Sequence, residues 1–150
     1  MYQRAYASAE RIFGLMDTPA RIVEDPDAEP LEVTDGRVVY EDATFGYDYE
    51  PPSGPDDESS GEPIVEDIEF TVEGGDTVAL VGPTGAGKST ILKLLLRMYD
   101  VDEGAITVDG TDLREVTIPS LRRQIGYVSQ DTFLFYGTVE ENITYGTFGA

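Results

Sequence analysis

The octapeptide Gly82-Pro83-Thr84-Gly85-Ala86-Gly87-Lys88-Ser89 has the G-x-x-x-x-G-K-[ST] pattern of a phosphate-binding loop. Its three glycines allow backbone conformations that are closed to residues with a Cβ, so successive N–H groups can point inward at phosphate oxygens. Lys88 is expected to reach the β- and γ-phosphates, and the Ser89 hydroxyl is expected to bind Mg²⁺. The loop therefore predicts a site for a nucleoside triphosphate, above all Mg-ATP.

The segments on either side of the loop support this interpretation. Residues 77–81 form a short continuous apolar run, which predicts a strand buried on both faces of a sheet. Residues 88–99 are apolar on several sides and predict a buried helix. The helix would add its positive end to the ring of loop amides. Strand, loop and helix in this order indicate an α/β fold with a P-loop NTPase-like sheet.

Further strands are expected before and after the loop. β-branched and aromatic residues predict strands over 37–45 and 64–72, and a third at 106–108 before the turn Asp109-Gly110. These strands suggest an antiparallel β subdomain beside the P-loop sheet. Near the end of the chain, Thr138 and Glu141 have the spacing of a capping box at the start of a helix.

The chain begins with segments of a different kind. An apolar stripe at helical spacing predicts a helix over 1–18, with Tyr2, Tyr6, Ala9, Ile12, Phe13 and Met16 on one face. Residues 19–36 are acidic and contain proline, as in an extended linker. Residues 48–63 carry four prolines, two glycines and many acids without apolar periodicity, so they are interpreted as a surface insertion.

Charge and composition exclude several classes of partner. Thirty acidic and ten basic residues give a formal charge of -20, which argues against nucleic acid or an anionic membrane surface. Lys88 and Lys93 are the only lysines. An acidic surface so poor in lysine suits a cytoplasm at molar salt, so a halophilic source is expected, with an acidic protein of an ordinary cell as the alternative. Without cysteine there is no disulfide and no thiolate metal site. No signal peptide and no run of eighteen apolar residues is present, so a soluble, unexported chain is expected.

The order of several motifs resembles the ATP-binding domain of ABC transporters. Phe45-Gly46-Tyr47 is followed by the phosphate loop, and then by 127–131 with the sequence Tyr-Val-Ser-Gln-Asp. Leu134-Phe135 and Glu141-Asn142-Ile143 continue the same pattern. The opening segment 6–13, followed by Asp-Thr-Pro at 17–19, resembles the stretch that joins the last membrane helix of ABC exporters to this domain. The resemblance covers nearly the whole chain, with the acidic insertion as the exception.

The resemblance implies roles for individual residues. Tyr47 matches the aromatic residue that stacks on adenine. Thr90 matches a hydroxyl near the α-phosphate, and Gln130 matches the glutamine that touches the Mg²⁺ sphere and the attacking water. The implied nucleotide-binding set is Tyr47, Gly82, Pro83, Thr84, Gly85, Ala86, Gly87, Lys88, Ser89 and Thr90, with Ser89 and Gln130 at the metal.

The resemblance also implies partners and limits. A membrane-spanning exporter domain and a second ATP-binding domain are the expected partners, at the cytoplasmic face of the membrane. The family pattern would continue with the LSGGQ signature, a catalytic glutamate and a switch histidine, and these 150 residues contain neither the signature nor any histidine. Residues 37–150 are therefore expected to be the N-terminal part of an incomplete ABC ATPase core. We therefore expect this chain to bind the nucleotide without appreciable hydrolysis, because its sequence offers no candidate general base.

Two local patterns imitate other sites and are rejected. Residues 38–42 are apolar residues followed by two acids, like a catalytic acidic strand, but they precede the phosphate loop. Residues 100–104 begin like a calcium loop, yet Ala105 and Thr111 stand where glycine and glutamate are required. Two other functions remain open. A P-loop kinase would need an acceptor site and a basic lid, for which Arg122-Arg123 is the one basic pair, and a noncatalytic interaction module would need a docking partner alone.

Overall fold

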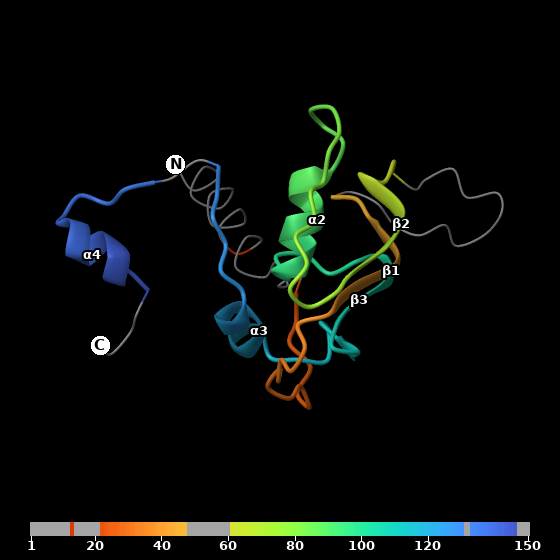
Figure 1. Cartoon of the computed structure of the whole chain (residues 1–150), viewed down its shortest axis with the longest axis horizontal. Coiled ribbons are helices and arrows are strands. Elements are labelled where there is room, and N and C mark those ends of the chain that lie inside the picture. Colours follow the sequence, from red (N-terminus) through yellow and green to blue (C-terminus); the bar gives the residue numbers. More distant parts are fainter. Residues whose placement is uncertain (1–12, 14–21, 48–60, 131–132, 147–150) are drawn as a thin grey trace, which may run out of the picture.

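The computed structural model describes residues 13, 22–47, 61–130 and 133–146 (Figure 1). The predicted helix over 1–18 therefore lies outside the described residues except for residue 13, and so do residues 48–60 of the acidic insertion. The described elements are β1 (Val38–Phe45), β2 (Val65–Val72), α2 (Lys88–Leu95), β3 (Glu103–Val108), β4 (Thr111–Asp112), α3 (Ile118–Gln124) and α4 (Val139–Thr144).

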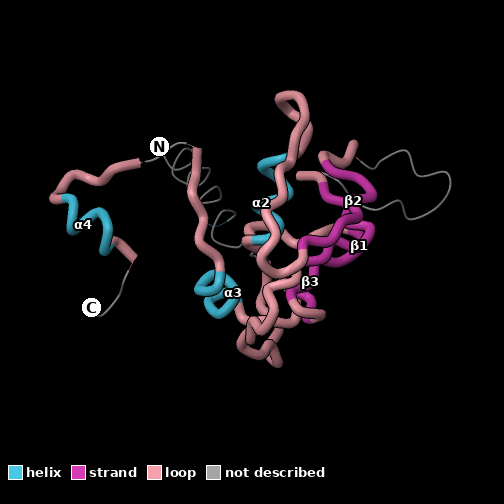
Figure 2. Tube along the Cα trace, in the orientation of Figure 1, coloured by secondary structure: helices cyan, strands magenta, loops and turns pink. Residues whose placement is uncertain are grey.

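The four strands form one antiparallel sheet in the order β2-β1-β3-β4 (Figure 2). The central strand β1 pairs on one edge with β2, where Val38 lies opposite Val72, and on the other edge with β3, where Val38 lies opposite Val108. The strands expected over 37–45 and 64–72 are confirmed. The strand expected at 106–108 is longer than predicted, since it begins at Glu103.

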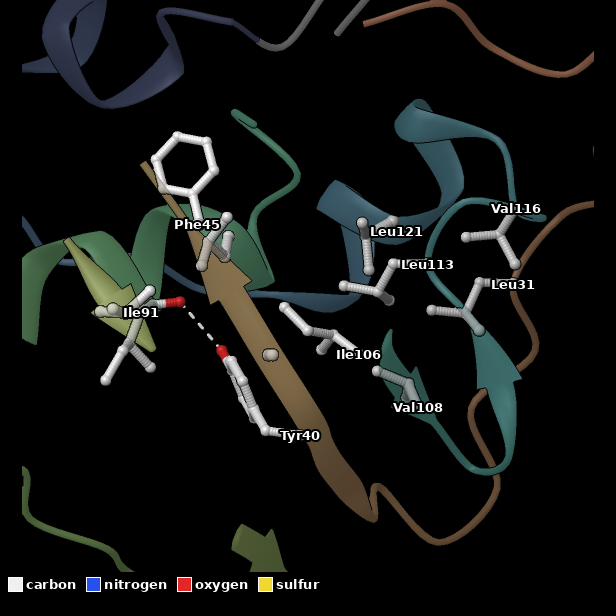
Figure 3. Close-up of a cluster of buried hydrophobic side chains, with 12 residues drawn as sticks. Leu31, Tyr40, Phe45, Ile91, Ile106, Val108, Leu113, Val116 and Leu121 are labelled. Carbon is white, nitrogen blue, oxygen red and sulfur yellow. Dashed lines mark hydrogen bonds between the residues drawn. The ribbon is translucent and has the colours of Figure 1, made fainter. Parts of the chain in front are cut away.

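A hydrophobic core lies where the sheet meets α2 and α3 (Figure 3). Tyr40 and Phe45 of β1 are 2% exposed, and Leu121 of α3 is fully buried. The Tyr40 hydroxyl donates a hydrogen bond of 2.9 Å to the carbonyl oxygen of Ile91 in α2. Burial raises the pKa of Tyr40 well above its ordinary value. This core fixes α2, and with it the loop that precedes it, on the sheet.

The Asp109-Gly110 turn has a second function beyond joining β3 to β4. Both residues have positive φ, 49° and 84°, which is the two-residue turn that matches the twist of a hairpin. The Asp109 carboxylate also accepts hydrogen bonds from the backbone N–H groups of residues 34–37, at 2.7 Å from Thr34 and from Arg37. These donors hold the pKa of Asp109 well below its ordinary range. One side chain thus ties the start of β1 to a turn far along the sequence.

The described part of the predicted linker contains a turn, in which the Ala28 N–H donates to the Asp25 carbonyl, and it packs on the region around α3. Glu29 forms an isolated parallel bridge with Val116. Leu31 is buried, and its N–H donates to the Ser120 hydroxyl at 2.8 Å. Arg97 is 2% exposed and donates to the Val116 carbonyl oxygen at 3.0 Å. The segment before β1 and the end of α2 therefore both contact Val116.

The strand predicted for 77–81 is wrong. These residues are extended but pair with no strand in the described part of the chain, and Val81 is 88% exposed. A doubly buried strand exists when neighbouring strands bond to it and helices cover both faces. The apolar residues Tyr127 and Val128 also follow α3 in an extended, exposed segment. The described sheet is therefore the antiparallel part of the fold that the sequence predicts.

The helix predicted over 88–99 is shorter and less buried than expected. It ends at Leu95, and Arg97 then takes a left-handed backbone conformation with φ of 46°. Leu92 and Met98 are each more than 40% exposed, because α2 is covered by the sheet and α3 on part of its surface. The carbonyls of residues 96 and 97 accept hydrogen bonds from the Arg122 guanidinium of α3, at 3.1 and 2.9 Å, which holds the end of the helix.

The capping box at α4 is confirmed. The Glu141 N–H donates to the Thr138 hydroxyl at 3.2 Å, and the Thr138 N–H donates to the Glu141 carboxylate at 2.7 Å. The Thr138 N–H and the Thr138 hydroxyl, which both donate to the Glu141 carboxylate, lower the pKa of Glu141. The helix stands apart from the sheet (Figure 1) and none of its residues is buried. Across the described residues, no helix combines the length and the apolar character needed to cross a membrane.

Candidate functional site

The loop at 82–87 enters α2 through a glycine that the fold requires. Gly87 is the N-cap of α2, with φ of 76° in the left-handed region. It packs so closely on β2 that a Cβ at this position would lie 2.5 Å from Cγ1 of Val65 and 3.0 Å from the Ile64 carbonyl oxygen. Glycine satisfies both constraints, since it has no Cβ and accepts positive φ. The sheet therefore positions the point where loop becomes helix.

Lys88 folds back over the loop that precedes it. Its ammonium donates hydrogen bonds to the carbonyl oxygens of Gly82, at 2.9 Å, and Pro83, at 2.6 Å. The N–H of Ala86 closes a turn on the same Pro83 carbonyl at 3.3 Å. The positive charge is thus held at the centre of the loop, within reach of any anion that the loop amides bind.

The first turn of α2 offers further groups for an anion. The N–H groups of Lys88 and Ser89 have no intrahelical acceptor because they open the helix, and Gly87 has no side chain that could cap them. Ser89 is exposed at this helix end, whereas Thr90 is buried and donates its N–H to the Gly87 carbonyl at 2.9 Å. A helix N-terminus with free amides favours phosphate. Thr84 and Gly85 complete the exposed side of the loop.

The donor set fits Mg²⁺ as a companion of phosphate. Mg²⁺ keeps several waters and takes one or two protein oxygens beside phosphate oxygens, so a dedicated cage is not needed. The exposed Ser89 hydroxyl supplies one such oxygen next to the loop. Among the described residues, no three side chains of the His, Cys, Asp or Glu types are gathered as a metal site. The loop therefore fits a metal that arrives with the nucleotide.

Tyr47 lies at the end of β1 beside α2. Its ring meets Phe45 at 5.3 Å and Tyr99 at 5.1 Å between ring centres, both nearly perpendicular. Its hydroxyl lies 3.4 Å from the ammonium of Lys93 on α2. The structure thus brings Tyr47 to the helix that begins at the phosphate loop, where a base could follow a bound triphosphate.

Gln130 is not brought to the loop in the same way. It follows the extended segment after α3 and is exposed, and no hydrogen bond joins it to the phosphate loop within the described residues. Its neighbours at 131–132 lie outside the described part of the chain.

Lys93 is a residue of this site that the sequence motifs did not identify. The available signal was a lysine five residues after Lys88 on one helix, in a chain with two lysines.

Comparison with known proteins gives one consistent family. The family model described as ABC transporter matches residues 65–148. An uncharacterized ABC transporter ATP-binding protein of Bacillus subtilis is 42% identical over 150 residues, which is all of this chain and 24% of that protein. The mitochondrial iron-sulfur clusters transporter of Neurospora crassa is 47% identical over 142 residues, covering 94% of this chain and 18% of that protein.

A solved structure agrees with these relatives. The structure of a bacterial Atm1-family ABC exporter with ATP bound superposes with a TM-score of 0.78 at 39% identity, over 96% of this chain and 24% of that chain. The fatty acid ABC transporter ATP-binding/permease protein of Mycobacterium tuberculosis is 44% identical over 145 residues, or 96% of this chain and 21% of that protein. The 150 residues thus span about a quarter or less of the length of the relatives they match.

Proposed function

This chain belongs to the ABC transporter family and is related to the ATP-binding domains of exporters, and from that premise we propose that it binds Mg-ATP through residues 82–90. The observation that carries the proposal is the Lys88 ammonium, held by the Gly82 and Pro83 carbonyls above the open amides of α2. Triphosphate oxygens would take the place of these carbonyls as partners of the ammonium, with a gain because they are charged.

Each part of the site has a proposed role. The loop amides and the start of α2 bind the β- and γ-phosphates, Ser89 supplies a ligand to Mg²⁺, and Thr90 lies nearest the α-phosphate. Tyr47 stacks on adenine. Gln130 belongs to this set by family resemblance and orients the attacking water near the Mg²⁺. For that role the segment around Gln130 has to approach the loop, since no contact between them is present in the described residues.

We propose that ATP binding here drives transport by a larger ABC exporter. The proposed partners are a membrane-spanning domain and a second ATP-binding domain, which would place the chain at the cytoplasmic face of a membrane. Two segments carry exposed apolar residues, Leu80 and Val81 before the loop and Tyr127 and Val128 after α3. Their exposure supports the proposal that another surface of the exporter packs against these segments. Turnover is proposed to need residues beyond these 150, because none of the described loop contacts supplies a general base.

A nucleotide titration tests the proposal. Lys88→Ala is expected to weaken binding of a fluorescent ATP analogue with Mg²⁺ by about 2 kcal/mol or more, the scale of a charge-assisted contact. Arg123→Ala is the matched control, because it removes one exposed positive charge from α3 and leaves the loop intact. Equal affinities for the wild type and Lys88→Ala would refute the site.

A phosphate-release assay tests the statement on turnover. The wild-type chain is expected to release phosphate from ATP no faster than Lys88→Ala. Turnover that disappears in Lys88→Ala would show that these residues carry a complete catalytic set.

A further inference from the structure

We infer that Lys93 is a positioning residue that orients the Tyr47 ring toward the nucleotide base, an inference that rests on the proposed ATP site. The Lys93 ammonium lies 3.4 Å from the Tyr47 hydroxyl oxygen and 5.9 Å from the centre of the ring. A cation above the ring face would lie at similar distances from both points. The ammonium therefore lies beyond the hydroxyl, near the long axis of the ring, and leaves the ring faces clear of its charge.

This contact acts on the direction of the ring. A distance of 3.4 Å is longer than an ideal N–H to O hydrogen bond, so the main force is the attraction between the ammonium and the phenolic oxygen. Phe45 and Tyr99 hold the body of the same ring, at 84° and 78° to its plane. Lys93 contacts the tip of the ring, and it lies on α2, whereas Phe45 ends β1 and Tyr99 lies shortly after α2.

Lys93 also links the base position to the phosphate position. Lys88 and Lys93 stand at the two ends of α2, five residues apart, which is about 7.5 Å along a helix axis. The spacing between the loop ammonium and the ring is thus set by one rigid helix. In a chain with two lysines among thirty acids, one lysine serves the phosphates and the other serves the aromatic platform.

The experiment compares two ligands that differ in the base. Lys93→Met keeps an unbranched side chain of similar length and removes the charge. Its expected effect is a loss of about threefold to tenfold in affinity for Mg-ATP, with no change for magnesium tripolyphosphate. Lys93→Arg, which keeps a positive group, is expected to recover part of the ATP affinity. In a Tyr47→Ala background, Lys93→Met is expected to have no further effect on ATP binding.

The outcomes separate this inference from the site itself. Equal losses for ATP and tripolyphosphate in Lys93→Met would overturn the inference, because Lys93 would then act on the phosphates. Unchanged affinity for both ligands would overturn it as well. A wild-type chain that binds neither ATP nor tripolyphosphate would instead overturn the proposed site. Lys88→Ala is the reference for a chain in which that site no longer binds. Circular dichroism of each variant confirms that the comparison is between folded chains.

Discussion

The Tyr40 hydroxyl on β1 and the Ile91 carbonyl oxygen on α2 are joined by a buried hydrogen bond of 2.9 Å, so the central strand directly contacts the helix of the phosphate loop (Figure 3). Tyr40→Phe keeps the ring, which stacks on Phe70 with ring centres 4.5 Å apart, and removes this bond. We expect a loss of about 1 kcal/mol in the free energy of unfolding. Urea denaturation measures it, with the exposed Tyr136→Phe as a control that should change little.

The close approach of Gly87 to β2 makes a second prediction. Gly85 and Gly87 both have positive φ, 88° and 76°, but a Cβ at Gly85 would meet no atom within 4 Å. Alanine at either position carries backbone strain of about 1–2 kcal/mol. Alanine at 87 must also displace Val65 or the Ile64 carbonyl, so Gly87→Ala should lose about 1–3 kcal/mol more than Gly85→Ala in urea unfolding. Equal losses would mean that β2 does not position the loop.

The Asp109 carboxylate predicts a pH dependence of stability. Its pKa is lowered in the folded chain by the N–H groups of residues 34–37, so its contribution is present above the ordinary value of 3.8 and is lost as pH falls below it. Asp109→Asn removes the charge and turns an NH₂ group toward one of these donors. The difference in free energy of unfolding between wild type and Asp109→Asn should therefore shrink between pH 5 and pH 3, both measured with urea. A difference that stays constant between pH 5 and pH 3 would contradict this prediction.

The formal charge of -20 predicts that added salt strengthens nucleotide binding. At 0.1 M salt, acids within about 10 Å of the site repel ATP, whereas near 1 M that range shortens to about 3 Å. The proposed contacts of Lys88 with phosphate would act at close range and survive screening. The dissociation constant for ATP should fall between 0.1 M and 3 M KCl, measured while circular dichroism reports the fold. A dissociation constant that rises steadily on a folded chain would contradict this prediction.

Local patterns predicted the local parts of the structure. The β-branched and aromatic residues of β1 and β2, the Asp109-Gly110 turn and the capping box at Thr138 are patterns of residues close in sequence, and the predicted elements are all present. The strand at 77–81 was wrong because a buried strand depends on neighbours, which the described residues do not supply. The same limit explains why the sequence did not predict α3 or the packing of the segment before β1 on it.

The site divides along the same line. The loop geometry around Gly87 and Lys88 follows from a motif contiguous in sequence, and the structure places that motif where a strand and a helix fix it. The contact between Tyr47 and Lys93 joins residues far apart in sequence, and no local pattern contains it. Gln130 was assigned by resemblance, and its position relative to the loop depends on segments that the described contacts do not hold.

The pairing at the ends of β1 and β2 makes the connection between them a place to accept inserted sequence. Phe45 lies opposite Val65, and the Ile64 N–H donates to the Phe45 carbonyl at 2.8 Å, so the two ends are fixed side by side by the sheet. The entropy cost of closing a chain between fixed ends grows with the logarithm of its length, and each doubling adds about 0.6 kcal/mol. A peptide tag or a small folded reporter inserted within residues 48–60 would thus lie between two strand ends that the sheet already holds together.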